Sequence, residues 1–281
     1  MSKGNLYIVA TPIGNLEDIS FRALSVLKEV DLIIAEDTRH SLSLLNHFNI
    51  QKPLESYHKF NESKKSINII SRLLEGKNIA LISDAGTPGI SDPGNILIKE
   101  AITNDINVIP IPGACALIQG LICSGFDTSN FSFLGFLSTT NKERKKQLEQ
   151  IKNSTTEIIV LYEAPHKLEK TLQDLLNTIG DSEICISKEI TKIHETHFRT
   201  TISNAIKFYS KNSPKGEYVI TIKKEIEKII YDISDKKTQE IIIDIYSSKK
   251  NNYKAKDIAK ELSDKLNISK NDIYSFILKI K

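Results

Sequence analysis

A twelve-residue loop, SDAGTPGISDPG from Ser83 to Gly94, holds the densest group of residues that could do chemistry. It contains three glycines, two prolines and two aspartates, directly after the apolar run NIALI. The glycines allow positive φ angles and close approach of a ligand to the backbone, and the prolines stiffen the path. A strand-to-helix turn capped by Asp92 would need only one aspartate and one glycine. The composition therefore favours a ligand-binding loop.

The residues of this loop also indicate which class of ligand it binds. The phosphate-binding patterns GxxxxGK[ST] and GxGxxG do not occur at the end of any predicted strand. The loop has no Lys or Arg between Ser83 and Asn95, so it is a poor site for a pyrophosphate. Its carboxylates, Asp84 and Asp92, can accept hydrogen bonds from ribose hydroxyls or an amine, and they attract cations. We therefore expect a neutral or cationic nucleoside, and S-adenosylmethionine fits this description.

Two further polar segments have simpler interpretations. The segment HETH lacks the HExxH spacing of a zinc-binding helix and is interpreted as a strand edge, so we expect no metal at His194, Glu195 and His197. The second segment is a short basic run. Such a run usually forms the solvent-exposed face of a helix, and the alternative is that it contacts the phosphate backbone of an RNA. Both interpretations apply to Lys142, Arg144, Lys145 and Lys146.

The first half of the chain predicts a sheet that can position these loops. Short apolar runs alternate with helix-period segments, and the runs are NLYIVA, DLIIAED, PLESYH, NIALISD and NVIPIPG. This alternation predicts an α/β domain over residues 1–124, with about five parallel strands covered on both faces. Ligands bind at the carboxyl ends of such strands. The polar junctions TPIGN, EDTRH, YHKFNE and PGACA fall at these ends together with the loop from Ser83 to Gly94.

The second half predicts a different kind of domain and a tail. Residues 125–228 contain more mixed strands and a helix over 165–180 with Pro165 in its first turn, which predicts a second, partly antiparallel α/β domain. Residues 229–281 have helical periodicity with small turns, and a helix-turn-helix-like appendage is one interpretation. From Lys207 onward there are 17 Lys and 11 Asp and Glu, so this end is basic. A polyanion-facing tail and a lysine-rich composition explain that charge equally well.

Length and composition are those of a globular protein. The 281 residues are 40% hydrophobic and 26% charged, with a net charge of +3. No apolar stretch reaches the length that crosses a bilayer, and the amino-terminal run is too short for a signal peptide. The three cysteines are odd in number and show no CxxC spacing. A cytoplasmic, reduced protein without a membrane segment is therefore predicted.

Eight segments in order along about 200 residues resemble ribosomal RNA small subunit methyltransferases of the tetrapyrrole methylase superfamily. They are LYIVATPIGNLEDIS, AEDTRHSLSLLNHF, YHKFNE, ALISDAGTPGISDPG, IPGACA, FLGFL, YEAPHKL and KEITK. The resemblance implies two α/β domains with S-adenosylmethionine in the cleft between them, and a homodimer. It also implies 2′-O-methylation of a cytidine in the decoding region of 16S ribosomal RNA in the small subunit.

The same resemblance implies which residues hold the cofactor. Position by position, these are Pro12, Asp84, Ala85, Gly86, Thr87, Pro88, Cys115, Ala116 and Glu163.

A ribose 2′-hydroxyl is a weak nucleophile, so a positioned base should assist methyl transfer. Our candidates are His58, Glu62 and Asp37, because they lie in junctions that face the same cleft. Structural roles are equally open: His58 could complete a strand end, and Glu62 could begin a helix in a favourable dipole position. Arg39 could clamp an RNA phosphate or pair with Asp37.

Two other functions remain open from the sequence. One is a methylase of a small tetrapyrrole or of a modified histidine of the diphthamide type, although the first loop of such enzymes usually reads GxGxGD and not TPIGN. The other is a non-catalytic nucleotide-binding or RNA-binding module.

Overall fold

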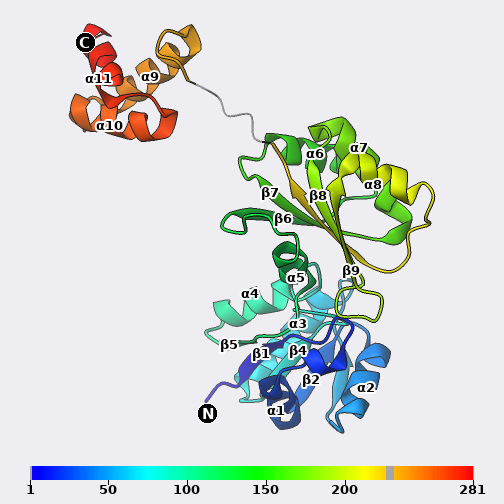
Figure 1. Cartoon of the computed structure of the whole chain (residues 1–281). Coiled ribbons are helices and arrows are strands. Elements are labelled where there is room, and N and C mark those ends of the chain that lie inside the picture. The colour runs from blue at the N-terminus through cyan, green and yellow to red at the C-terminus, as the bar shows by residue number, and fades with distance from the viewer. Residues whose placement is uncertain (1, 226–230, 281) are drawn as a thin grey trace. The chain divides into compact units, whose positions relative to one another are not determined.

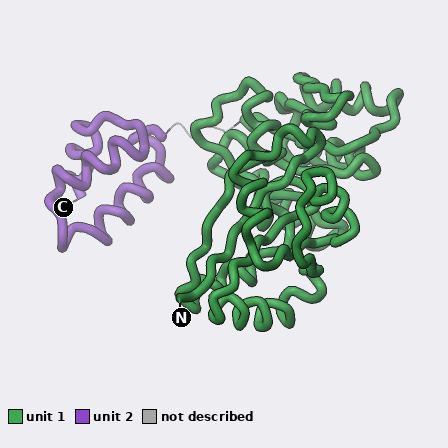
Figure 2. Tube along the Cα trace, turned by 90° about the horizontal axis from the view of Figure 1, so that it is seen from below, with its two compact units in different colours: residues 1–225 green, residues 226–281 purple. Residues whose placement is uncertain are grey.

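The computed structural model of the protein describes residues 2–225 and 231–280. The chain forms two compact units, residues 1–225 and 226–281 (Figure 2). The domain boundary predicted between residues 228 and 229 falls within 226–230, which lie outside the described residues.

The first half of unit 1 is built on a five-stranded, fully parallel sheet in the order β3-β2-β4-β1-β5 (Figure 1). Its strands are β1 (Asn5–Val9), β2 (Leu32–Ala35), β3 (Leu54–Ser56), β4 (Ile79–Ile82) and β5 (Asn107–Ile111). The strands β2 and β4 are buried at every residue, as expected for a sheet covered on both faces. The predicted parallel α/β architecture is confirmed.

Helices cover both faces of this sheet. Successive strand residues point to opposite faces, so Leu6 of β1 packs with α3 (Glu62–Leu74) and α4 (Asn95–Thr103). Its neighbours on the other face, such as Val9, pack with α1 (Phe21–Glu29) and α2 (Thr38–His47). A short 3-10 helix, η1 (Leu16–Asp18), comes after the first strand.

The second half of unit 1 has a mixed sheet in the order β6-β7-β10-β8-β9. Only β6 and β7 pair in parallel among its described strands, which confirms the predicted partly antiparallel arrangement. The strands are β6 (Phe131–Phe136), β7 (Ile158–Glu163), β8 (Glu183–Lys188), β9 (Thr196–Thr201) and β10 (Tyr218–Lys223). His197 lies in the edge strand β9, as its segment predicts.

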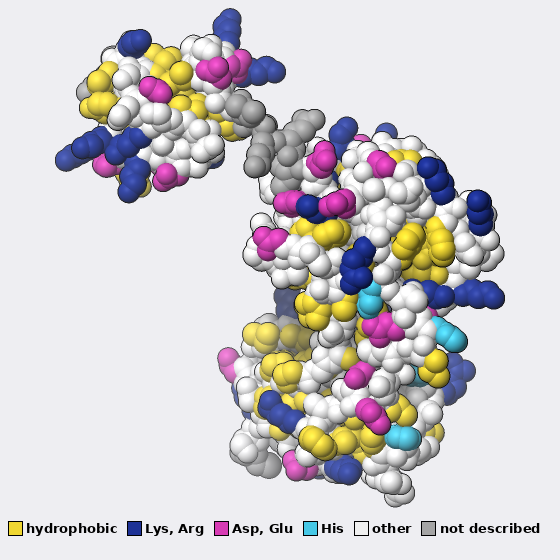
Figure 3. Space-filling view, in the orientation of Figure 1, with side chains coloured by type: hydrophobic (Ala, Val, Ile, Leu, Met, Phe, Trp, Pro, Cys, Tyr) yellow, Lys and Arg dark blue, Asp and Glu magenta, His cyan; other side chains and the backbone are white. Residues whose placement is uncertain are grey.

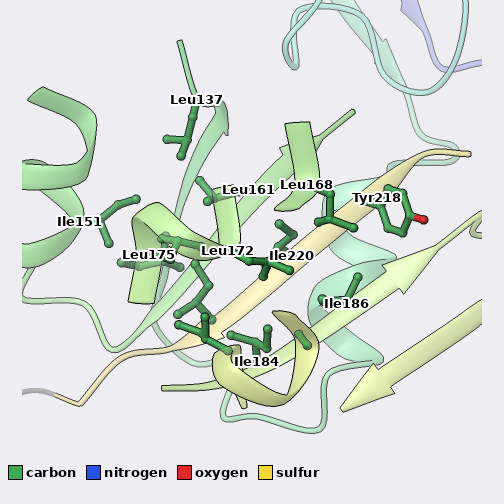
Figure 4. Close-up of a cluster of buried hydrophobic side chains, with 14 of the residues drawn as sticks. Leu137, Ile151, Leu161, Leu168, Leu172, Leu175, Ile184, Ile186, Tyr218 and Ile220 are labelled. Carbon is green, nitrogen blue, oxygen red and sulfur yellow. The ribbon is translucent and has the colours of Figure 1, made fainter. Parts of the chain in front are cut away.

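One face of this second sheet carries its main core. Figure 4 shows leucines of α7 (Pro165–Ile179) packing against Leu161 of β7 and Ile220 of β10. The helices α6 (Asn141–Asn153) and α8 (Ile202–Tyr209) contribute Ile151 and Ile202 to the same cluster.

The opposite face of the second sheet is covered by α5 (Ala116–Ile122), a helix that comes directly after the first sheet in sequence. A Cβ atom at Gly120 would lie 2.5 Å from a methyl carbon of Val219, so this position requires a glycine for α5 to pack closely on β10. The helix precedes the predicted division after residue 124 but packs against strands on the far side of that division. Since both sheets belong to one compact unit, the division stays a prediction.

The basic run on α6 is only partly a solvated face. Arg144 is 5% exposed, and its Nε donates to Asp174 Oδ2 at 2.7 Å. The expectation of a solvent-facing Arg144 was therefore wrong, because α6 turns this side chain towards α7. Lys142, Lys145 and Lys146 are exposed, as predicted.

The described part of the second unit, residues 231–280, forms three helices around its own small core. They are α9 (Lys236–Lys249), α10 (Ala255–Leu266) and α11 (Lys270–Ile280), and α10 is joined to α11 by residues 267–269. Ile242, Leu262 and Ile277 are fully buried in this core. Residues 231–280 carry ten Lys and eight Asp and Glu, and on the face seen in Figure 3 the two signs are interspersed. Within residues 2–225 and 231–280, no helix is long and apolar enough to span a bilayer.

Candidate active site

Two cavities open at the carboxyl edge of the first sheet. The larger has a volume of about 500 Å³ and is enclosed by both halves of unit 1. The first half lines it with Ile13, Ala85, Gly86, Thr87, Ile90, Ser91, Asp92, Cys115 and Ala116. The second half lines it with Phe136, Tyr162, Glu163, Ala164, Pro165, His166, Ile190, Glu217, Tyr218 and Val219.

Most of the residues predicted to hold a cofactor line this larger cavity. They come from three separate segments and are Ala85, Gly86, Thr87, Cys115, Ala116 and Glu163. Pro12 and Pro88 are neighbours in sequence of lining residues. Asp84 lines the second cavity instead.

The loop from Ser83 to Gly94 turns sharply along the cavity wall. Gly86, Gly89 and Gly94 have φ angles of 84°, 81° and 142°, and Ser91 has 67°. Residues other than glycine rarely adopt such φ angles, which explains the repeated glycines of this loop. The loop is held to the end of β1, because the N–H of Thr11 donates to the carbonyl of Gly86 at 2.9 Å and the N–H of Gly86 donates back at 3.0 Å.

The backbone N–H and C=O of Gly86 already pair with Thr11, so they are not available to a ligand. The contribution of Gly86 is that it has no side chain to fill the cavity. A Cβ atom there would lie 3.2 Å from Cγ2 of Ile13, another lining residue. Thr87 is fixed by its hydroxyl, which donates to the carbonyl of Ala114 at 3.1 Å.

Aromatic side chains from the second half form the opposite wall. The Tyr162 hydroxyl accepts a hydrogen bond from the N–H of Leu117 at 2.9 Å, which fixes the start of α5. Burial raises the pKa of this phenol, so Tyr162 stays neutral at physiological pH. Its ring contacts Phe136 edge to face, with 5.6 Å between the centroids.

Glu163 is buried, and its carboxylate is held within the protein. Oε1 accepts from the N–H of Ala164 at 2.8 Å, and Oε2 accepts from the Thr171 hydroxyl at 2.5 Å. Arg144 donates to the same hydroxyl at 2.8 Å. Glu163 therefore fixes the turn between β7 and α7, and the residues of this turn line the cavity.

Asp92 gives the larger cavity its electrostatic character. Burial, with the nearby carboxylates of Glu36 and Asp84, raises the pKa of Asp92 to about 7. A cation in the cavity would stabilise the charged form of Asp92 and would be attracted by it. The rest of the lining is mostly apolar, with Ile13, Ile90 and Val219 among it.

The second cavity, of about 460 Å³, lies at the ends of β2 and β3. It is polar and is lined by Glu36, Asp37, Thr38, Arg39, Ser56, His58, Phe60 and Asp84. Asp84 accepts a hydrogen bond from the N–H of Asp37 at 3.0 Å, and this bond joins the loops after β2 and β4. Burial, and then the nearby Asp84, raises the pKa of Glu36.

The three candidate bases occupy different positions. Asp37 caps α2 and pairs with Arg39 at 2.6 Å, and these hydrogen bonds hold the pKa of Asp37 well below its usual range. His58 lines the second cavity. Glu62 is the first residue of α3 and lies outside the residues that line either cavity. Asp37 is thus a weak base, and the ion pair expected as one role of Arg39 is formed.

Several lining residues had no signal in the sequence. Glu217, Tyr218 and Val219 lie at or within an ordinary strand, β10, and reach the cavity only through the packing of the second sheet. Asp92 did carry a signal, since it is the second aspartate of the glycine-rich loop.

A family model described as Tetrapyrrole (Corrin/Porphyrin) Methylases matches residues 5–206. The chain belongs to this family. Its match begins with β1 and ends within α8, so it spans most of both sheets and most of the residues of the larger cavity. The two cavities therefore belong to a methylase.

Curated relatives of this methylase share one name, Ribosomal RNA small subunit methyltransferase I. A protein of that name from Synechocystis sp. is 50% identical over 220 residues, which cover 78% of each chain. Another from Buchnera aphidicola is 41% identical over 279 residues, covering 98% of this chain and 97% of that protein. The second alignment includes the C-terminal helices.

Solved structures share the fold of the methylase. Uroporphyrin-III C-methyltransferase from Thermus thermophilus, in complex with S-adenyl homocysteine, matches with a TM-score of 0.55 at 13% identity. The match covers 78% of this chain and 97% of that one. The predicted two-part α/β fold with additional C-terminal helices is confirmed.

Proposed function

We propose that this chain transfers a methyl group from S-adenosylmethionine to the 2′-hydroxyl of a cytidine in the decoding region of 16S ribosomal RNA. The observation that carries the proposal is the similarity, over up to 98% of the chain, to relatives named Ribosomal RNA small subunit methyltransferase I. Its substrate is RNA within the small ribosomal subunit, and it acts as a homodimer in the cytoplasm.

The larger cavity fits S-adenosylmethionine. Its volume of about 500 Å³ lies within the usual range for small-molecule sites. Its apolar and aromatic wall suits an adenosine, and Asp92 suits the positive sulfonium. When bound, this cofactor supplies an electrophilic methyl group. Lining residues that would hold it include Ala85, Gly86, Thr87, Cys115 and Ala116, with Glu163 keeping the opposite turn in place.

The chain's own contribution to the reaction is orientation and exclusion of water. Methyl transfer from a sulfonium is an in-line displacement, so the distance and angle between acceptor and donor decide the rate. The two halves of unit 1 enclose the larger cavity, and the second cavity lies on the other side of Asp84. Of the three candidate bases, Asp37 and His58 line the second cavity; Asp37 is held in an ion pair with Arg39, and Nε2 of His58 lies 3.1 Å from the amide nitrogen of Asn61.

Transfer of tritium from methyl-labelled S-adenosylmethionine to purified small ribosomal subunits tests the proposal. We expect the label in 16S ribosomal RNA, on one ribose whose adjacent phosphodiester bond resists alkaline hydrolysis. We also expect assembled subunits to be better substrates than naked RNA. Label in a tetrapyrrole or in a protein would support the other methylases. Absence of transfer despite cofactor binding would indicate a binding module and contradict the proposal.

A further inference from the structure

The second cavity has the lining of a nucleotide site, and the cofactor does not account for it. We propose that this cavity, bounded by Glu36, Arg39, His58 and Phe60, receives one nucleotide of the acceptor RNA turned out of its helix. The inference rests on the proposed function, because it assigns the acceptor side of the same reaction. A volume of about 460 Å³ suffices for a nucleoside monophosphate.

Phe60 provides the surface on which a base can stack. Its side chain is 96% exposed, although it lines a cavity and lies in the turn that precedes α3. The ring sits 6.1 Å from the His58 ring, centroid to centroid. Enzymes that do chemistry on a base within a duplex extrude its nucleotide, and aromatic side chains stack on bases that are unpaired.

Hydrogen bonds with Asn61 fix the His58 imidazole in the wall of the cavity. The side-chain oxygen of Asn61 accepts a hydrogen bond from the backbone N–H of His58 at 2.9 Å. The side-chain nitrogen of Asn61, Nδ2, is therefore the atom that faces the imidazole Nε2 of His58, at 3.1 Å. Nδ2 can only donate, and therefore Nε2 of the neutral ring accepts and the ring proton lies on Nδ1. That Nδ1 is buried and has no hydrogen-bond partner among the described residues. Because Nδ1 has no exposed surface, the nucleotide does not contact it in this conformation, and the imidazole contributes a fixed part of the cavity wall beside Phe60.

Arg39 provides the phosphate contact at the rim. Its side chain is 89% exposed, and Nε and Nη2 both donate to Asp37, at 3.1 and 2.6 Å. The pairing holds the guanidinium plane in place and leaves its Nη1 hydrogens available for a phosphate oxygen. Since Asp37 is neutralised by this pair, it repels a polyanion less than a free carboxylate would.

Two carboxylates provide acceptors deeper in the cavity and connect it with the cofactor side. Glu36 and Asp84 can accept hydrogen bonds from ribose hydroxyls or from the exocyclic amine of cytosine. Asp84 is directly succeeded in the chain by Ala85 and Gly86, which line the larger cavity. A ribose held by Glu36 and Asp84 would thus lie next to the methyl donor.

The chain contains no tryptophan, and this permits a direct test. In the variant Phe60→Trp the indole at position 60 is the only tryptophan of the chain, so its fluorescence can be measured alone. A base stacked on it quenches this fluorescence. We expect the single-stranded pentacytidylate RNA to quench it in the presence of S-adenosylhomocysteine. The matched control is Phe21→Trp, since Phe21 is 92% exposed on α1 of the same half and lies outside both cavities. We expect no quenching there.

A second measurement uses small subunits as substrate. Loss of one base-stacking contact weakens binding by about 1–3 kcal/mol, so Phe60→Ala should lower kcat/KM by about fivefold to 150-fold. Phe21→Ala should leave it unchanged, and both variants should bind S-adenosylhomocysteine as the unmodified protein does.

The outcomes separate the two proposals. If the unmodified protein labels no RNA, the proposed function fails irrespective of the variants. If it labels RNA while Phe60→Ala matches Phe21→Ala, or if pentacytidylate leaves the Phe60→Trp emission unchanged, the acceptor subsite is overturned. Quenching together with a selective loss in Phe60→Ala supports it.

Discussion

The two cavities of unit 1 share one loop but differ in almost every other respect. The larger is enclosed by two sheets and is mostly apolar, with the carboxyl groups of Asp92, Glu163 and Glu217 in its lining, whereas the smaller is polar and belongs to the first sheet alone. The loop from Ser83 to Gly94 reaches both, with Asp84 in one wall and Gly86 in the other. The difference indicates a division of labour, in which a cationic donor and an RNA acceptor meet across a single polypeptide segment.

Closing the larger cavity should have the largest effect on this comparison. In Gly86→Val, a β-branched side chain would occupy a φ of 84° and press on Ile13. We expect S-adenosylhomocysteine to bind at least about tenfold more weakly in calorimetry, a loss of about 1.4 kcal/mol or more.

The matched control for that variant is Gly125→Val. Gly125 has a φ of 79°, but no described atom lies within 4 Å of a Cβ added there. It incurs the same backbone strain without touching the cavity. Equal losses of affinity in both variants would contradict the cavity assignment.

Removing the support of the turn between β7 and α7 should change stability, in contrast to the loss of cofactor affinity expected for Gly86→Val. Arg144→Ala leaves Asp174 and the hydroxyl of Thr171 without their buried partner, and we expect unfolding in urea to require about 2–3 kcal/mol less free energy. Lys145→Ala, on the exposed face of the same helix, should change it by less than about 0.5 kcal/mol. An Arg144→Ala variant as stable as the unmodified protein would contradict the role given to this ion pair in holding the turn between β7 and α7.

The charge of Asp92 should govern discrimination between cofactor and product. With its pKa raised to about 7, Asp92 is largely neutral at pH 6 and largely charged at pH 8. Only the charged form attracts the sulfonium of S-adenosylmethionine, whereas the sulfur of S-adenosylhomocysteine is uncharged. The affinity for S-adenosylmethionine relative to S-adenosylhomocysteine should therefore rise several-fold from pH 6 to pH 8. In Asp92→Asn the ratio of the two dissociation constants should not vary with pH. A ratio that still rises would assign the effect to another group.

The smallest effect is expected from the C-terminal unit. All lining residues of both cavities lie within residues 2–225. A chain ending at Glu225 should therefore bind S-adenosylhomocysteine within about twofold of the full chain. A larger change in calorimetry would show that residues 226–281 contribute to the cofactor site.

Local sequence patterns predicted much of this architecture and part of the site. Apolar runs predicted the strands, and the glycine-rich loop predicted a ligand site because glycines and prolines act through local backbone geometry. Asp84 and Glu62 show what local sequence patterns do not predict. Both lie in loops or helix starts at the correct sheet edge, but a loop's position does not decide which way its side chains point.

By itself, the sequence determined the order of strands and helices, the positions of the tight loops and the family of the chain, because backbone preferences and hydrophobic periodicity act over a few residues. Only the tertiary structure decided that α5 packs on the second sheet, that Arg144 is buried and that Tyr218 and Val219 complete the larger cavity. These features arise from packing between segments that lie far apart in the chain, and no local pattern encodes such a contact.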